Sequence, residues 1–233
     1  MKILVLNGNT TAAVTERMIA ALKPICPESV HLVGATAPFG LPYVSTRAAV
    51  AVAAHAVQEA VRAAVEGEQV AGRAPFDACF YACFGEPGIE ALRAEHTFPV
   101  AGMAEASILT ALQLGERFAI VTVGAAWPAM LRDLMRRTAL EARCAGIKVV
   151  PGDALAVATG REEGLKLVRA AVDEVIARAA PDVVIVAGAA LAGYGTALAG
   201  RVPVPVLDSL TAGFEQTLAL ARLGLGLGLG RGD

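Results

Sequence analysis

Two segments of the sequence share one pattern and differ at the residue best suited to acid–base chemistry. Each segment opens with an aspartate, Asp77 or Asp182, and continues through an apolar run to an alanine and a glycine-rich turn. The residue after that alanine is Cys83 in the first segment and Gly188 in the second. A thiol with an ordinary pKa of about 8.5 lies near the range in which side chains move protons at neutral pH. The pattern predicts that Cys83 is a catalytic residue, and the second segment has no thiol at the matching place, Gly188.

The alternative interpretation of Cys83 is a small buried hydrophobic residue, as free cysteines often are. That interpretation suits Cys26, Cys79 and Cys144 better, because Cys83 adjoins a glycine turn. Four scattered cysteines do not form a disulfide framework. On a strand, Cys79 and Cys83 would lie about 13 Å apart, too far for a bridge or a shared zinc ion. The three histidines show no ligand-like spacing, so no metal site is expected.

Polar side chains at strand ends are candidates for substrate binding. Asn7 and Asn9 close the first predicted strand and could hydrogen-bond a carboxylate or a ring carbonyl, or serve only as turn and N-cap residues. Thr122 ends the corresponding strand of the second half and could do the same, or could reflect β propensity alone. Tyr43 could line the mouth of a cleft or lie in an ordinary surface loop.

Backbone groups of the two turns are further candidates. The N–H groups of Phe84, Gly85 and Ala189 could stabilise an enolate-like oxygen. Pro87 suits the first turn of a helix that we expect to begin directly after the first turn segment. The free N–H groups of that helix start could hold a carboxylate or favour a thiolate at Cys83.

Alternating strands and helices must position these residues. Strands are predicted at 2–7, 29–34, 78–84, 118–124, 147–152, 183–188 and 204–208. Helices are predicted at about 11–24, 47–66, 87–95, 103–114, 127–145, 161–180 and 209–222. Several strands are continuously apolar, which is typical of parallel strands covered on both faces. The sequence therefore predicts an α/β protein with open parallel sheets.

The two halves also resemble one another. "KILVLNGNTTAAVTERMIAAL" and "FAIVTVGAAWPAMLRDLMRRT" each read as a strand, a small-residue turn and an amphipathic helix. We expect two similar Rossmann-like lobes related by pseudo-twofold symmetry, the first formed by 1–98 with 209–233 and the second by 99–208. The active site is expected between the lobes, beyond the carboxyl ends of the strands. The alternative is that α/β units resemble one another through their pattern alone.

Composition excludes several classes of partner. Hydrophobic residues make up 55% and charged residues 18%, with a net charge of −2. This balance gives no electrostatic case for binding nucleic acid or an anionic membrane. No uncharged apolar run reaches the roughly 18 residues of a membrane span, and Met1 leads directly into a strand-like segment. A cytoplasmic protein is predicted, and its alanine-rich helices leave homo-oligomer formation open.

The order of these motifs resembles that of the hydantoin racemases. "NGNTTAAVTERM" resembles their Asn-x-Asn-Thr opening, and "ACFGEPGIEALR" followed by "PVAGMAEAS" resembles their first cysteine motif and its sequel. "RFAIVTVGAAW" and "VPVLD" continue the match, which covers essentially the whole chain. The wider aspartate/glutamate racemase superfamily includes arylmalonate decarboxylases and maleate isomerases. The resemblance implies two lobes, no cofactor, and cysteines acting on a carbon next to a carboxylate or carbonyl of a small carboxylate or cyclic ureide.

The sequence departs from this family at the second cysteine motif. The family pattern implies one cysteine per lobe, on opposite faces of the substrate carbon, so that one removes a proton and the other returns one. Cys83 matches the first motif. The second, a Gly-Cys-Ala-Gly type motif, reads Ala187-Gly188-Ala189-Ala190 here. The resemblance therefore implies an isomerase of the racemase type with a single catalytic thiol.

Several reactions remain compatible with one thiol. A one-face isomerase, a racemase in which water or Tyr194 serves the Gly188 face, and covalent addition of the maleate isomerase type are all open. Decarboxylation of the arylmalonate type needs only one proton donor, but those enzymes keep the second-lobe cysteine and have glycine in the first. A non-catalytic protein that binds a small carboxylate is the alternative outside enzymes.

Overall fold

A computed structural model of the chain describes residues 1–152 and 154–224. The chain forms two compact units. Unit 1 contains Met1–Val44, Ala48–Met103 and the residues from Gly213 onward, and unit 2 contains Ser45–Arg47 and Ala104–Ala212. The boundaries between the two units lie after Met103 and after Ala212. Both are a few residues beyond the boundaries at 98/99 and 208/209 that the sequence suggests.

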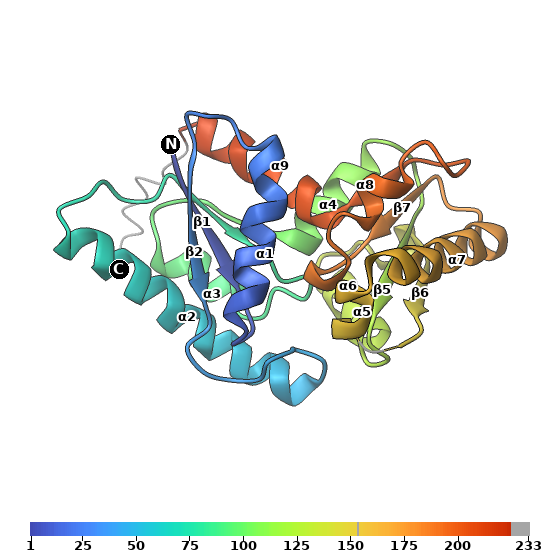
Figure 1. Ribbon diagram of the computed structural model, residues 1–233, viewed down its shortest axis with the longest axis horizontal. Helices are drawn as coiled ribbons and strands as arrows, with labels where there is room; N and C mark the ends of the chain where they lie inside the picture. The colour runs from blue at the N-terminus through green and yellow to red at the C-terminus, as the bar shows by residue number, and fades with distance from the viewer. Residues whose placement is uncertain (153, 225–233) are drawn as a thin grey trace. The chain divides into compact units, whose positions relative to one another are not determined.

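Each unit contains one parallel sheet of four strands (Figure 1). Unit 1 has the order β2-β1-β3-β4, and unit 2 has the order β6-β5-β7-β8. The strands are β1 (Lys2–Asn7), β2 (His31–Thr36), β3 (Ala78–Tyr81), β4 (Val100–Gly102), β5 (Phe118–Val123), β6 (Cys144–Val150), β7 (Val183–Val186) and β8 (Val206–Asp208). The predicted α/β class with parallel sheets is confirmed. Strand β4, which has three residues, was not predicted from the sequence.

Helices connect successive strands in both units. The α-helices are α1 (Ala12–Leu22), α2 (Arg47–Val70), α3 (Ile89–Glu95), α4 (Met103–Leu112), α5 (Trp127–Arg137), α6 (Ala154–Thr159), α7 (Arg161–Ala179), α8 (Tyr194–Leu198) and α9 (Ser209–Arg222). Short 3₁₀ helices are η1 (Lys23–Ile25), η2 (Glu141–Arg143) and η3 (Ala189–Leu191). The single helix predicted over 127–145 was wrong beyond Arg137, because Ala139 has a positive φ of 58° and β6 begins at Cys144.

Helices cover both faces of the unit 1 sheet. Adjacent residues of β2 point to opposite faces: a side chain at Gly34 would meet Thr15 of α1, whereas Ala35 packs in a cluster with Val57 of α2. Figure 1 shows α1 and α2 on the two sides of β1 and β2. By length and mean hydropathy alone α2 could cross a membrane, but its Val57 face is buried in this cluster. Burial on both faces explains why β1 and β3 are continuously apolar.

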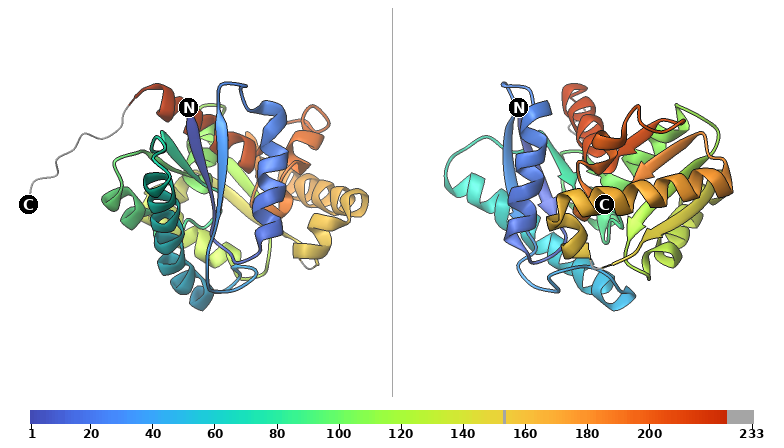
Figure 2. Two further views of the ribbon diagram at one scale, coloured as in Figure 1. Left: turned by 60° about the vertical axis from the view of Figure 1, so that its left-hand side comes forward. Right: turned by 45° about the vertical axis from the view of Figure 1, so that its right-hand side comes forward.

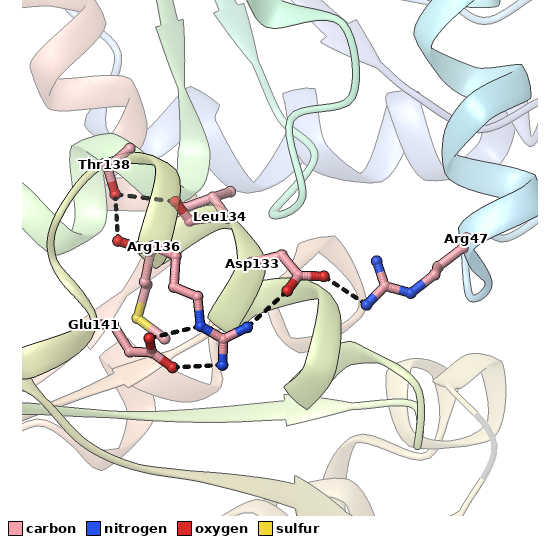
Figure 3. Close-up of polar contacts among 7 residues, drawn as sticks. Arg47, Asp133, Leu134, Arg136, Thr138 and Glu141 are labelled. Carbon is pink, nitrogen blue, oxygen red and sulfur yellow. Dashed lines mark hydrogen bonds and ion pairs between the residues drawn. The ribbon is translucent and has the colours of Figure 1, made fainter.

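In unit 2, α7 packs along β5 and β6, as the right-hand view of Figure 2 shows. All six side chains of β5 and all four of β7 are buried. The exposed side of α5 carries a chain of ion pairs in which Asp133 joins Arg47 to Arg136, and Arg136 also pairs with Glu141 (Figure 3). Because these groups are solvent-exposed, the network contributes little to stability.

The two sheets repeat one hydrogen-bonding pattern at their carboxyl ends. The Ala82 N–H donates to Leu6 O at 2.9 Å, and the Ala187 N–H donates to Val121 O at 2.8 Å. Each alanine thus follows the third strand of its sheet and is bonded to the central neighbouring strand. The residue after each alanine has the same place in its own unit.

Candidate active site

Cys83 lies at the carboxyl end of β3, as the sequence predicts. It is the second residue after the strand and is partly exposed, whereas Cys79, within β3, is fully buried in the core. Burial raises the pKa of Cys79 far above its ordinary value. These positions agree with the assignment of Cys79 to packing, and they place Cys83, a residue that is partly exposed, at the edge of the sheet.

The turn after Cys83 differs from the one expected. Helix α3 begins at Ile89, and its N-cap is Gly88 with a φ of 78°. The prediction of Pro87 in the first helical turn was wrong, because the left-handed conformation of Gly88 separates it from the helix. Glu86, also with a positive φ of 50°, donates its N–H to Cys83 O at 3.1 Å. A tight turn, rather than a helix start, holds the thiol.

Two residues that the sequence analysis did not select pack around Cys83. Tyr81 is fully buried, and its hydroxyl donates to Pro87 O at 3.1 Å. A Cβ at Gly8 would lie 3.0 Å from the Tyr81 hydroxyl oxygen and 3.3 Å from the Cys83 Cβ. Glycine at position 8 therefore lets the first strand end approach both side chains closely. The period-two spacing of Tyr81 and Cys83 within the predicted strand 78–84 was the signal that could have identified Tyr81.

The surroundings of Cys83 act on its ionisation in opposite directions. Burial raises the pKa of the Cys83 thiol, and hydrogen bonds from the Gly85 and Glu86 N–H groups oppose this rise. The carboxylate of Glu86 raises the pKa further. The Tyr81 hydroxyl lowers it by hydrogen-bonding the thiolate, for which its proton has to turn away from Pro87 O. The balance is a raised pKa, so the thiol is protonated at neutral pH and has donors ready for the thiolate.

Asn7 and Asn9 form a local hydrogen-bonded turn at the end of β1. The buried Asn7 amide donates to Asn9 Oδ1, Thr11 O and Thr15 Oγ1 at 3.0–3.2 Å. Asn9 Oδ1 also accepts the Thr11 N–H at 2.9 Å. No partner within the described residues binds Asn9 Nδ2. Asn9 has a donor available for a ligand, while the donors of Asn7 are used within the turn; substrate binding by either residue stays a prediction.

The loop that contains Tyr43 lies against this turn. The Thr10 N–H donates to Leu41 O at 3.2 Å, and Thr11 Oγ1 donates to Pro42 O at 2.9 Å. Tyr43 is half-buried and belongs to the same unit as Asn9 and Cys83. The structure thus brings its backbone to the carboxyl end of β1, and its contact with substrate stays a prediction.

Phe84 and Gly85 have different surroundings within the Cys83 turn. Phe84 is buried, whereas Gly85 is partly exposed. The Gly85 N–H hydrogen-bonds the sulfur of Cys83 when the thiol is ionised. Stabilisation of a substrate oxygen by these two N–H groups stays a prediction, and that of Gly85 would compete with the sulfur for the same proton.

Gly188 occupies in unit 2 the place that Cys83 has in unit 1. Its φ of 103° and ψ of 152° fall in a region that side-chain-bearing residues rarely adopt. A Cβ at this position would meet no atom within 4 Å. The Gly188 N–H donates to Ser209 Oγ at 3.0 Å. The turn therefore has space for a thiol but a backbone suited to glycine.

The other candidates of unit 2 are engaged in structural hydrogen bonds. The buried Thr122 hydroxyl donates to Ala187 O at 3.3 Å. Ala189 begins η3, and the Ala192 N–H donates to its carbonyl at 3.4 Å. Tyr194 is buried, and its hydroxyl donates to Val157 O at 2.6 Å. Roles for Thr122 and Ala189 in substrate binding stay predictions.

Asp208, at the end of β8, was not selected from the sequence. It is buried, and its carboxylate accepts the N–H groups of Gly193, Leu210 and Thr211 at 2.6–3.4 Å. Burial raises its pKa, while these N–H groups oppose the rise. The carboxylate joins the Gly193 turn to the first turn of α9. Across residues 1–152 and 154–224, no group of three or more His, Cys, Asp or Glu side chains could hold a metal ion.

Comparisons with known proteins find relatives along nearly the whole chain. The family model described as Asp/Glu/Hydantoin racemase matches residues 3–217. The hydantoin racemase of Pseudomonas sp. (strain NS671) is 28% identical over 224 residues, which cover 96% of this chain and 87% of that protein.

Solved structures show the same likeness. The allantoin racemase of Pseudomonas fluorescens superposes with a TM-score of 0.86 at 29% identity, covering 96% of this chain and 92% of that chain. An arylmalonate decarboxylase superposes with a TM-score of 0.70 at 16% identity, covering 95% and 92% of the two chains. The second likeness concerns the fold alone.

Proposed function

Because the chain belongs to the Asp/Glu/hydantoin racemase family, we propose that it moves a proton at the carbon next to a carbonyl group of a small cyclic ureide, with Cys83 as its acid–base residue. The observation that carries the proposal is the position of the Cys83 thiol. Cys83 is a partly exposed residue at the carboxyl end of a buried parallel strand, where ligands of such sheets bind, and its thiol is buried against the core of unit 1.

The surroundings of Cys83 suit a residue that alternates between thiol and thiolate. The neutral thiol is favoured by burial, and the thiolate would be stabilised by the N–H groups of Gly85 and Glu86 and by the Tyr81 hydroxyl. A thiolate that has removed a proton from carbon becomes the thiol, which can return a proton to the same carbon. The negative charge meanwhile resides on the substrate carbonyl oxygen as an enolate, which N–H donors stabilise.

The names of the relatives support a cyclic ureide as the proposed substrate. Their names include hydantoin racemase and allantoin racemase, and both hydantoins and allantoin are cyclic ureides with an acidic carbon between a nitrogen and a carbonyl. Such rings present carbonyl oxygens that accept hydrogen bonds. The Nδ2 group of Asn9 is a donor of the required kind at the same sheet edge as Cys83.

Because the second thiol is missing, we expect proton exchange at the substrate carbon and inversion of that carbon to proceed at different rates. Cys83 can remove and return a proton on one face, which exchanges the proton without inverting the carbon. Inversion needs a proton donor on the other face. The family pattern assigns that role to a second cysteine, and the matching residue in this sequence is Gly188, which has no proton to donate. We infer that exchange outpaces inversion, with water as the proton source for the slower inversion.

Decarboxylation is the second candidate because the Cys83 thiol is protonated at rest. Loss of CO2 from a malonate-type substrate leaves the bonding electrons on carbon, and a thiol can then protonate that carbon. This reaction needs one donor on one face. An arylmalonate therefore belongs in the same set of test compounds as hydantoins and allantoin.

The proposal is tested by incubating enantiopure 5-substituted hydantoins, allantoin and arylmalonates in D2O and following the α-proton and CO2 by NMR. We expect deuterium to enter a cyclic ureide faster than in an enzyme-free blank, and Cys83→Ala to abolish the difference. Cys144→Ala is the matched control, because Cys144 is also a half-buried thiol with a pKa raised by burial. Ligand binding with no exchange and no CO2 release would instead identify a non-catalytic binding protein.

A further inference from the structure

Glu86 is a buried acidic residue within the turn that follows Cys83. It is 5% exposed, and its φ of 50° is in the left-handed region that residues with side chains seldom adopt. Its N–H donates to Cys83 O at 3.1 Å, and its carbonyl accepts the Ile89 N–H at 3.2 Å. The backbone of Glu86 therefore links Cys83 directly to the start of α3.

The side chain of Glu86 reaches across to the neighbouring strand. A Cβ at Gly102 would lie only 2.2 Å from Glu86 Oε1 and 2.3 Å from its Cδ, so the carboxyl group occupies the space that any side chain at position 102 would need. Gly102 ends β4 and pairs in register with Tyr81 of β3. The carboxyl group thus lies at the same edge of the sheet as the Tyr81–Cys83 segment.

Unit 2 places a carboxylate at the corresponding edge in a different way. Asp208 ends β8 and pairs in register with Val186, just as Gly102 pairs with Tyr81. Its carboxylate is part of the strand end and is held by several backbone N–H groups. In unit 1 the strand end is a glycine, and the carboxylate comes from the turn that carries the thiol.

We propose that Glu86 is a positioning residue that fixes the turn of Cys83 and places a negative charge close to its sulfur. The charge disfavours the thiolate, while the Glu86 N–H favours it, so a single residue acts on the thiolate in two opposite directions. The titratable groups that act on Cys83 are Glu86 and Tyr81. The nearby first strand end contributes Gly8, which carries no charge.

This arrangement deepens the proposed function, on which its catalytic consequence rests. A thiol kept protonated can donate a proton to a carbanion, whereas removal of a proton from carbon needs the thiolate, which the N–H groups of Gly85 and Glu86 favour. Neutralising Glu86 would lower the pKa of Cys83, because it removes a negative charge that repels the thiolate. A lower pKa means more thiolate at neutral pH and faster alkylation.

Iodoacetamide alkylation of Cys83, followed by mass spectrometry from pH 6 to pH 10, tests the proposal without requiring turnover. Glu86→Gln should move the midpoint of the alkylation profile to lower pH and raise the rate at pH 7 by severalfold or more. Glu86→Asn should do the same and provides a second neutral variant, since asparagine tolerates positive φ. Glu90→Gln, on the exposed side of α3, is the matched control and should leave the profile unchanged.

An unchanged midpoint in a folded neutral variant would overturn the proposal. An equal acceleration at every pH would also overturn it, because that result reports a more accessible thiol and not an altered ionisation. Failure of the proposed function would give a different result. The alkylation midpoint of Glu86→Gln would still move to lower pH, but the wild-type protein would exchange no ureide proton.

Discussion

Cys83 and Gly188 occupy equivalent positions in two sheets of the same topology. Each follows an alanine whose N–H bonds the central neighbouring strand, Ala82 in unit 1 and Ala187 in unit 2. Their backbones nevertheless differ. Gly188 has a positive φ of 103°, whereas the φ of Cys83 is not positive. The two turns therefore differ in backbone conformation as well as in the thiol, because the conformation of the second turn favours glycine.

Alkylation of wild-type Cys83 is expected to be slow at neutral pH. Burial and the Glu86 carboxylate raise the pKa of the thiol, so its thiolate fraction is small at pH 7 and rises about tenfold per pH unit below that pKa. Iodoacetamide labelling read by mass spectrometry at several pH values measures this. Fast labelling at pH 6 that is independent of pH would contradict the raised pKa.

Tyr81→Phe should raise the pKa of Cys83 and lower the stability of the fold only slightly. The substitution removes the hydroxyl that donates to Pro87 O and hydrogen-bonds Cys83, and the loss of one buried hydrogen bond costs about 1 kcal/mol. Tyr194→Phe is the matched control, since that buried hydroxyl donates to Val157 O. Both variants should unfold at similarly lower urea concentration, and only Tyr81→Phe should move the alkylation profile of Cys83, toward higher pH. Equal profiles in the two variants would exclude a role for the Tyr81 hydroxyl.

Gly188→Cys should restore a second thiol at a cost in stability. The position has room for a side chain, but its φ and ψ impose about 1–3 kcal/mol of backbone strain. Gly188→Ala carries the same strain without the thiol and serves as the control. We expect both variants to be destabilised alike in urea titrations, and only Gly188→Cys to raise the rate of inversion relative to exchange. No gain in a folded Gly188→Cys variant would argue against a role for this position.

Glu68 should make stability depend on pH in the acid range. Hydrogen bonds from Arg73 and then Lys2 lower its pKa from 4.5 to about 2. A carboxyl group whose pKa is lower when folded stabilises the protein above its unfolded pKa, and this contribution is lost as pH falls from about 4.5 to about 2. Glu68→Gln should therefore lower stability at pH 7 but not at pH 2, while the exposed Glu66→Gln should change neither. Urea titrations at pH 7 and pH 2 measure the free energy of unfolding of each variant. Equal effects of Glu68→Gln at the two pH values would contradict the lowered pKa of Glu68.

The sequence predicted the sheets well because buried parallel strands are continuously apolar. The repeated Asp77 and Asp182 marked equivalent strand starts, and both carboxylates accept the N–H of the neighbouring central strand, from Lys2 at 2.6 Å and from Arg117 at 2.8 Å. Periodicity gave no signal for β4, which has three residues, or for α8, which has five. Elements this short are specified by their tertiary neighbours and not by a repeating pattern.

The immediate surroundings of Cys83 were harder to predict than its position. Glycine turns after apolar strands pointed to Cys83, and the structure places it at the strand end. The sequence could not show that Glu86 turns inward against Gly102, because that contact joins segments 16 residues apart through a positive φ at Glu86. Asn7 shows the reverse case: a polar strand-end residue whose donors are used within its own turn.

The central claim is that one thiol serves one face of the substrate carbon. It is tested most directly by placing an enantiopure 5-substituted hydantoin in D2O with the wild-type enzyme and measuring deuterium incorporation by NMR and inversion by chiral chromatography in the same samples. We predict that deuterium enters the starting enantiomer well before the opposite enantiomer accumulates, and that Cys83→Ala removes this exchange. Inversion that keeps pace with exchange, or exchange that survives in Cys83→Ala, would contradict the account.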